Sequence, residues 1–324
     1  MIQRPQASGS VTPVSRPPSS GEYARDRLFR GLAMSGALLI IALTAYILWE
    51  IGRQALPAVG RYGIDFLTGT TWNVNKGEFG VLPEIWGTLY SSLLALLIGG
   101  IFGVSIAIFL TQDFIPHRLA TVFRTIVEML AAIPSVVFGL WGIHVLLPLL
   151  KPAAAWLHGH LGWLPLFGTD LSGPGMAPAA LVLAIMVLPT IAAISVDAFR
   201  RIPYKVKEAA YGMGTTRWEA ILKMMVPTAS SGLLAALVLG FGRALGETMA
   251  LAMLIGNANQ ISLSLFSPAD TLASLLASNF PEAGRIEVQA LMYAALVLLA
   301  ITFVVNVAGL AVQQYTVRKF EGKR

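Results

Sequence analysis

Two ionisable residues, Arg243 and Glu247, lie near the middle of an apolar segment at residues 230–256. Residues four positions apart share one face of a helix, so the two side chains are predicted to meet. A charge at the centre of a membrane helix costs about 2.5–3.5 kcal/mol, and such residues are usually paired or face a cavity. The permanent charge and planar donors of arginine suit an oxyanion, and Glu247 would hold the guanidinium when no anion is bound. A purely structural ion pair is the alternative.

A second pair, Arg124 and Glu128, occupies the start of another apolar segment at residues 124–150. Arg124 is predicted to lie close to the membrane surface, where its long side chain can extend to water. Pro134 is expected to kink this helix. Glu128 and Ser135 are therefore secondary candidates for polar groups on a path through the membrane.

A third stretch, EAAYGMGTTRWEAILKMMVP, runs from Glu208 to Pro227. Gly212 and Gly214 permit a tight turn, so the stretch predicts two short helices joined by that turn. The two alanines after Glu208 are small enough for a partner to approach closely, and Glu208 can accept hydrogen bonds from it. An amphipathic connector that lies on the bilayer without a partner is the alternative.

The elements that must position these residues are membrane helices. Of the 324 residues 56% are hydrophobic and only 12% are charged, which is far more apolar than a soluble domain. Six segments are long enough to cross a hydrocarbon core, which needs about 20 residues. They span residues 31–49, 85–110, 124–150, 176–196, 230–256 and 288–312. This pattern predicts an all-α, polytopic membrane protein with a bundle of about six transmembrane helices.

The basic residues predict the orientation of this bundle. Lysine and arginine gather in residues 1–30, in the loop at residues 197–229 and in residues 313–324. The positive-inside rule therefore places both termini and this loop in the cytoplasm. Residues 1–30 are rich in proline and serine and predict a disordered tail, residues 31–312 form the membrane domain, and residues 313–324 form a basic tail. The net charge of +6 thus reflects topology, and binding to nucleic acid is not expected.

Several function classes are disfavoured by the composition. The chain has no cysteine and only four histidines, so a metal site with three or four ligands is not expected. It contains no G-x-x-x-x-G-K-[ST] motif, so it should not hydrolyse ATP itself. A polytopic membrane enzyme that uses Glu128 or Glu247 as an acid or base stays an alternative, although it would need a cluster of polar groups. A channel or secondary carrier would leave the motif from Glu208 to Pro227 without a role.

The motif from Glu208 to Pro227 resembles the cytoplasmic loop of the permeases of bacterial ABC importers, in which E-A-A is followed after three residues by glycine. The matching positions are Glu208, Ala209, Ala210, Gly214 and Pro227. The resemblance implies the type I (MetI-like) permease fold. It also implies that the segment from Glu208 to Gly214, with Gly212, docks on a separate ATPase subunit.

Three further stretches, FGVLPEIWGTLYSSL, AAIPSVVFGLWGI and GRALGETMAL, resemble the PstC-type permeases of the high-affinity phosphate importer, over about residues 60–312. The resemblance implies a role in transport for Arg243 and Glu247 and a location in the bacterial inner membrane. The implied partners are a second, homologous permease subunit, an ATPase dimer that carries ATP and Mg, and an extracytoplasmic phosphate-binding protein. No cofactor is expected on this chain. An importer permease for sulfate or molybdate is the alternative, because the docking loop is common to the whole superfamily.

Overall fold

The computed structural model describes residues 20–321, and the chain comprises two compact units, residues 1–50 and 51–324. In the first unit, helix α1 (Ser20–Tyr62) is exposed along residues 21–49. The predicted disordered tail does not extend over residues 20–30, because these are already helical. Residues 20–30 are not part of the apolar segment, but their arginines and leucine favour a helix. The rest of the predicted tail, residues 1–19, lies outside the described residues.

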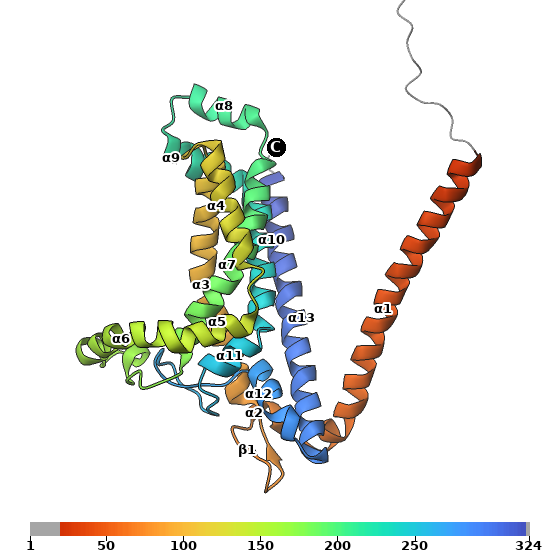
Figure 1. Cartoon of the computed structure of the whole chain (residues 1–324), viewed down its shortest axis with the longest axis vertical. Coiled ribbons are helices and arrows are strands. Elements are labelled where there is room, and N and C mark those ends of the chain that lie inside the picture. The colour runs from red at the N-terminus through yellow and green to blue at the C-terminus, as the bar shows by residue number, and fades with distance from the viewer. Residues whose placement is uncertain (1–19, 322–324) are drawn as a thin grey trace, which may run out of the picture. The chain divides into compact units, whose positions relative to one another are not determined.

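The second unit is a bundle in which four long helices lie side by side (Figure 1). They are α3 (Leu82–Thr111), α7 (Met176–Arg200), α10 (Val226–Leu245) and α13 (Arg285–Glu321). Helix α7 packs against both α3 and α10, and α13 packs against α10. Glycines at the contacts allow close approach, since a Cβ on Gly99 of α3 would lie 2.9 Å from the Ala184 carbonyl oxygen of α7.

The third apolar segment is not the continuous helix that was predicted at residues 124–150. It divides into α4 (His117–Leu130), α5 (Ser135–Trp141), the π-helix η1 (Gly142–Leu146) and α6 (Leu147–Leu161). Pro134 precedes α5 with an extended backbone, at φ −58° and ψ 140°, and a proline lacks the N–H that would continue a helix. Helix α4 lies along the bundle, whereas α5 and α6 run across the end opposite α8 (Figure 1).

The fifth apolar segment, predicted as one helix over residues 230–256, is also broken. The short helix α9 (Arg217–Glu219) leads through the π-helix η3 (Ala220–Met225) into α10, which ends at Leu245. Gly246 caps α10, and a separate helix α11 (Met249–Leu254) follows. The apolar run continues through this break, although glycine is a poor helix former.

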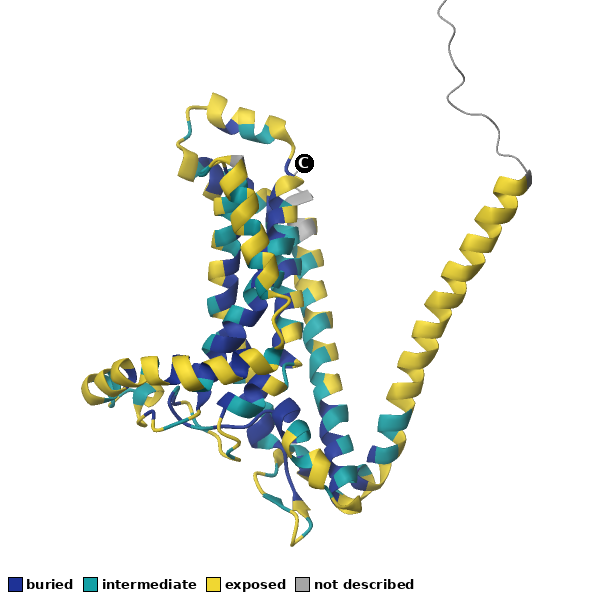
Figure 2. Ribbon diagram, in the orientation of Figure 1, coloured by how far each residue is buried: buried dark blue, intermediate teal, exposed yellow. Residues whose placement is uncertain are grey.

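The remaining elements are short. They are α2 (Asp65–Thr68), β1 (Trp72–Asn73), β2 (Glu78–Phe79), the 3₁₀ helices η2 (Pro165–Phe167) and η4 (Phe280–Glu282), α8 (Tyr204–Gly212) and α12 (Leu272–Asn279). The antiparallel hairpin β1–β2 pairs Trp72 with Phe79 and is a small departure from the predicted all-α architecture. Figure 2 shows that buried residues follow α7 and collect around α11 and α12.

Within residues 20–321, six helical segments are long and apolar enough to cross a membrane, which is the number that the sequence predicted. The third of them is Ser135–Leu161 and not the predicted segment at residues 124–150. The basic segment at the end of the chain is helical as far as Glu321, because α13 continues beyond the apolar part. Helices α8 and α9 and the C-terminal end of α13 lie at one end of the bundle, and α6, α12 and the hairpin lie at the other (Figure 1). The residues with candidate functions are therefore distributed between two ends and the middle.

Candidate functional site

Arg243 is in the last turn of α10, at about the middle of the bundle's apolar length, and its side chain is exposed. Its Nη1 donates a hydrogen bond to the Thr190 hydroxyl of α7 over 3.1 Å. Thr190 follows Pro189, which lies inside α7. The sequence analysis missed Thr190, although a hydroxyl beside a proline in an apolar segment was a signal for it.

Glu247 does not share a helix face with Arg243, because α10 ends at Leu245 and Gly246 redirects the chain. Its Oε1 instead lies 3.5 Å from the amide nitrogen of Ala250, at the start of α11. Among the described residues no ion pair joins Arg243 and Glu247. The predicted pair is therefore wrong for this conformation, and the guanidinium is held by a neutral hydroxyl.

This arrangement leaves most of the Arg243 donors available. A guanidinium carries five N–H donors in a rigid fork, and the hydrogen bond to Thr190 uses one of them. The remaining donors lie on an exposed surface of α10 rather than in the core of the chain. An oxyanion that approaches this surface can accept two parallel hydrogen bonds from such a fork.

The first part of the motif from Glu208 to Pro227 forms the end of α8 and the turn after it. Glu208, Ala209, Gly212 and Gly214 are exposed, as a docking segment requires. Ala210 is fully buried in a cluster with Ile221 and Met225 of η3. We therefore assign Ala210 to the attachment of α8 to the bundle, in place of the predicted contact with a partner.

The turn after α8 is defined by local hydrogen bonds. Gly214 has φ +78°, a left-handed conformation that favours glycine. The Thr215 hydroxyl donates to the Ala210 carbonyl oxygen over 2.8 Å. Thr216 and Glu219 form a reciprocal capping box at the start of α9. The sequence thus builds a fixed helix–turn–helix that leads directly into α10.

The surface of α8, α9 and the turn between them carries large exposed side chains. These were not predicted as functional residues. Tyr204, Tyr211, Met213 and Trp218 are 72%, 47%, 67% and 58% exposed, respectively. Tyrosine, tryptophan and methionine are enriched at protein interfaces. Their presence on both sides of Glu208 strengthens the prediction of a docking surface at this end of the bundle.

Arg217 connects α9 to a different part of the chain. Its Nη2 donates to the Asp113 carbonyl oxygen over 2.7 Å, and its guanidinium lies 4.5 Å from the centre of the Phe114 ring. Asp113 and Phe114 belong to the loop between α3 and α4. Arg217 was counted only as a topological charge in the sequence, but it ties α9 to this loop.

The secondary candidates lie apart from Arg243. Arg124 was predicted to extend to water, but it forms an i, i+4 ion pair with Glu128, with 2.7 Å between Nε and Oε1. Both side chains are partly exposed, at 35% and 51%, so the pair contributes little to stability. Ser135 is half-buried at the first position of α5, beyond the break at Pro134. Neither residue is brought next to Arg243 by the fold.

A buried polar cluster at the α12 end was also missed. Thr271 N and the Ser274 hydroxyl both donate to Asp270, which is 5% exposed. Leu272 N donates to the Thr88 hydroxyl, which itself donates to the carbonyl oxygen of the buried residue Glu84 in α3. Burial raises the pKa of Asp270 to about 6, against the smaller opposing effect of its hydrogen bonds. The cluster joins the first turn of α3 to the first turn of α12.

Comparison with known proteins adds to this geometry. Residues 99–322 match the family described as binding-protein-dependent transport system inner membrane component. The phosphate transport system permease protein PstC of Mesorhizobium japonicum is 36% identical over 304 residues, which cover 92% of this chain and 91% of the relative. The protein of the same name from Xylella fastidiosa is 40% identical over 284 residues, with 85% and 86% covered. A probable PstC protein of Methanocaldococcus jannaschii is 35% identical, with 87% and 91% covered.

Two solved structures share the fold. The alginate ABC transporter, in complex with a pentasaccharide-bound periplasmic protein, has a TM-score of 0.60 at 16% identity and covers 88% of this chain and 94% of its own. The MetNI methionine ABC transporter in an inward-facing conformation has a TM-score of 0.54 at 18% identity, with 73% and 95% covered. These similarities confirm the predicted type I (MetI-like) permease fold.

Proposed function

The chain belongs to the family of binding-protein-dependent transport system inner membrane components, and we propose that it is the permease subunit of an ATP-driven importer of inorganic phosphate. The observation that carries this proposal is the exposed guanidinium of Arg243 at mid-bundle, which is held by Thr190 alone among the described residues. The names of the similar proteins support phosphate as the cargo. They favour neither an importer for sulfate or molybdate nor a membrane enzyme.

The exposed position of Arg243 supports a path that this chain forms only in part. A charge in an apolar environment requires a partner or a water-filled cavity, and Arg243 lies on the outer surface of the described bundle. A second, homologous permease would cover this surface and enclose a path. Selection of phosphate would then fall mainly to an extracytoplasmic binding protein, and the path would supply donors for the passing anion.

The α8 end supports docking of an ATPase. Basic residues are concentrated there, including Arg200, Arg201, Lys205 and Lys207, so the positive-inside rule supports a cytoplasmic location for this end. The basic residues near each terminus support the same location for the two termini. The exposed side chains of α8 would insert into a cleft of one ATPase subunit. ATP and Mg would be bound by that partner, because this sequence has no nucleotide-binding motif.

The contacts of α8 suggest how ATP binding reaches the path. Closure of the ATPase dimer would displace α8, and the buried Ala210 would transmit this movement to Ile221 and Met225 of η3. Because η3 continues directly into α10, the movement would reach Arg243 through one helix. The surface around Arg243 would then change from inward to outward access.

Uptake of radiolabelled phosphate into proteoliposomes that contain the complete transporter tests this function. We expect uptake to require ATP on the α8 side and to be unaffected by excess sulfate. Arg243→Gln should reduce uptake at least about tenfold, since it removes charge-assisted hydrogen bonds. The matched control is Arg118→Gln, which removes an exposed charge from the α3–α4 side of the bundle. Uptake without ATP, or full uptake by Arg243→Gln, would contradict the proposal.

A further inference from the structure

Helix α10 contacts two other long helices on different sides, and Arg243 lies on a face of α10 that remains exposed. Helix α7 approaches α10 at Gly232 and Gly240, where a Cβ would lie 2.5 Å from the Ala198 side chain and 2.6 Å from that of Ile191. Helix α13 approaches α10 on a different side, where a Cβ on Gly242 would lie 3.2 Å from the Asn306 side chain. Helices α7 and α13 have few contacts with one another. Between these two contacts, one face of α10 carries Arg243 near its end and, closer to its start, Thr228, Ser231 and Ala235, which line a cavity.

One face of α7 extends from the contact with Arg243 toward the α8 end. Thr190, Ile194, Asp197 and Arg201 are spaced by four, three and four residues, so they share a helix face. Thr190 contacts Arg243. Arg201 lies 11 residues further, which is roughly 16 Å along a helix that rises 1.5 Å per residue. The same side of α7 thus presents Thr190, which contacts the Arg243 guanidinium, and the Arg201 guanidinium at the end of the helix.

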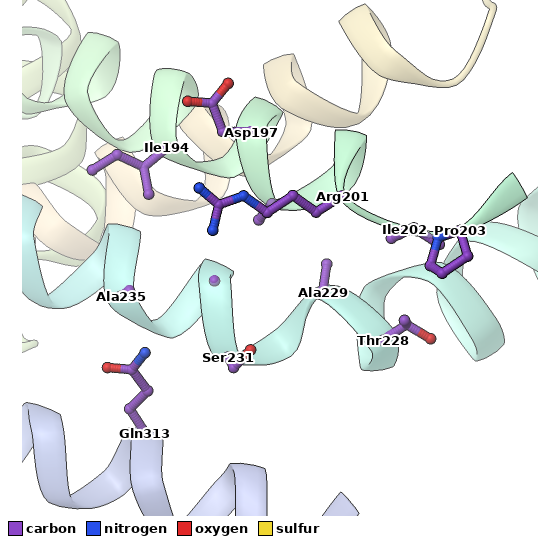
Figure 3. A pocket seen from close by; sticks show the side chains of 12 residues that line it. Ile194, Asp197, Arg201, Ile202, Pro203, Thr228, Ala229, Ser231, Ala235 and Gln313 are labelled. Atoms are coloured by element: carbon purple, nitrogen blue, oxygen red, sulfur yellow. The ribbon is translucent and has the colours of Figure 1, made fainter. Parts of the chain in front are cut away.

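A cavity of about 480 Å³ lies beside Arg201. Figure 3 shows the Arg201 guanidinium directed along α7 over α10, and the Gln313 amide extending from α13 toward the same space. Ser231 and Thr228 of α10 add hydroxyl groups to the lining. The Asp197 carboxylate is directed away from α13 (Figure 3). Among the described residues, no ion pair joins Arg201 to Asp197.

We propose that this cavity is a second binding site for a phosphate-type oxyanion, with Arg201, Ser231 and Gln313 as its donors. Guanidinium, hydroxyl and amide groups are the donors that a phosphate accepts hydrogen bonds from. On the proposed function, on which this inference rests, the site is the cytoplasmic exit of the path that begins at Arg243. The headgroup of an anionic phospholipid offers the same chemistry, and the experiment below separates the two sources.

Two weak sites in series suit transport better than one strong site. Conduction needs binding that is favourable enough for entry and weak enough for release. At the exit, Asp197 lies four residues from Arg201, and its negative charge would weaken the hold on an anion. The position of the cavity at Arg201, Ile202 and Pro203, immediately before α8, also places it where movement of α8 would alter its shape.

Thiol labelling tests the site independently of transport. The chain contains no cysteine, so Ala235→Cys introduces a single thiol into the cavity lining without removing a proposed donor. The complete transporter is placed in nanodiscs of phosphatidylcholine alone, and labelling of this chain by a maleimide is followed with increasing inorganic phosphate. Chloride at equal ionic strength is the control for screening. We expect phosphate to slow the labelling. Arg201→Gln should raise the phosphate concentration needed for this protection about tenfold.

The matched control is Arg200→Gln, which removes the same charge from the neighbouring position outside the cavity lining. It should leave the protection unchanged. If inorganic phosphate has no effect but phosphatidylglycerol in the nanodisc slows labelling in an Arg201-dependent manner, the oxyanion is a lipid headgroup. No protection by either source, or equal effects of the two arginine substitutions, would overturn the site. Protection without ATP-dependent uptake would contradict the proposed function alone, and uptake without protection would contradict the site alone.

Discussion

At the scale of single residues, the hydrogen bond between Thr190 and Arg243 determines where the guanidinium points. An arginine side chain has many rotamers, and a fixed partner limits them before an anion arrives. The hydroxyl is 3.1 Å from Nη1. It is a neutral partner, so it orients the charge without cancelling it. Thr190 is thus a positioning residue for the proposed path.

The variant Thr190→Val keeps the shape of the side chain and removes the hydroxyl. We expect the maximal rate of phosphate uptake to fall by about three- to tenfold, because a hydrogen bond to a charged group contributes only a few kcal/mol and Arg243 itself is retained. Thr190→Ser retains the hydroxyl and should restore most of the uptake. Uptake kinetics in proteoliposomes measure both variants. Normal kinetics of Thr190→Val would show that the bond does not position Arg243.

Asp270 leads to a prediction about pH and stability. Its pKa is about 6 in the folded chain, compared with 3.8 normally, so the folded state binds more protons than the unfolded state between these values. The free energy of unfolding should therefore fall as pH rises through this window, by up to about 1.4 kcal/mol per pH unit. The contribution of Asp270 protonation to the free energy of unfolding is fully present below pH 3.8 and is lost above about pH 6.

Asp270→Asn removes this titration and keeps an oxygen that can accept from Thr271 and Ser274. The difference in thermal stability between the variant and the unchanged chain should depend on pH between 3.8 and about 6 and level off above that range. A difference that is constant with pH would contradict this assignment.

At the scale of elements, the connection between α9 and the loop after α3 gives α8 a second attachment to the bundle. Arg217 bonds to the Asp113 carbonyl and stacks on Phe114. Movement of α8 can therefore be passed to both α10 and α3. Arg217→Ala should reduce phosphate uptake several-fold and leave ATP hydrolysis by the complete transporter largely intact, since it affects transmission rather than the nucleotide site.

The control for this prediction is Lys223→Ala. It breaks the ion pair between Lys223 and Glu219, in which the side chains are 71% and 44% exposed, and pairs of this kind contribute little. The ratio of phosphate transported to ATP hydrolysed is the quantity to compare. An equal ratio in the two variants would show that the contact of Arg217 does not couple the two processes.

The sequence predicted the existence of the helices better than their continuity. Apolar composition identified all six spans within the described residues, because burial in lipid requires it. The breaks at Pro134 and Gly246 depend on the backbone, and an apolar run continues through both. The predicted pairing of Arg243 and Glu247 failed for this reason. The cavity beside Arg201 could not be predicted, since it depends on how α7 and α13 pack on α10.

At the scale of the whole molecule, the described residues provide one side of a path and one docking surface, at separate levels of the same bundle. Arg243 is at mid-bundle, and α8 is at one end. The motif at α8 was predictable because a docking segment uses consecutive residues. Of the proposed path, only Arg243 could be predicted, because a charge in an apolar segment is visible in the sequence. The other residues of the path would come from different helices and from a partner.

The orientation of this bundle yields the last prediction, and the absence of cysteine makes it simple to test. Gly212, at the end of α8, and Gly284, before α13, are both exposed, with open space where a Cβ would be added. Gly212→Cys and Gly284→Cys are thus matched variants at opposite ends of the bundle. The basic residues around α8 predict that this end is cytoplasmic.

A membrane-impermeant thiol reagent applied to intact cells should therefore label Gly284→Cys and leave Gly212→Cys unlabelled, and inside-out vesicles should give the reverse. An ATPase that docks on α8 from the cytoplasm should additionally slow the labelling of Gly212→Cys in those vesicles. Labelling of Gly212→Cys in intact cells would place α8 outside. That result would contradict the orientation, the docking surface and the direction of transport together, because all three require α8 to meet an ATPase where ATP is available.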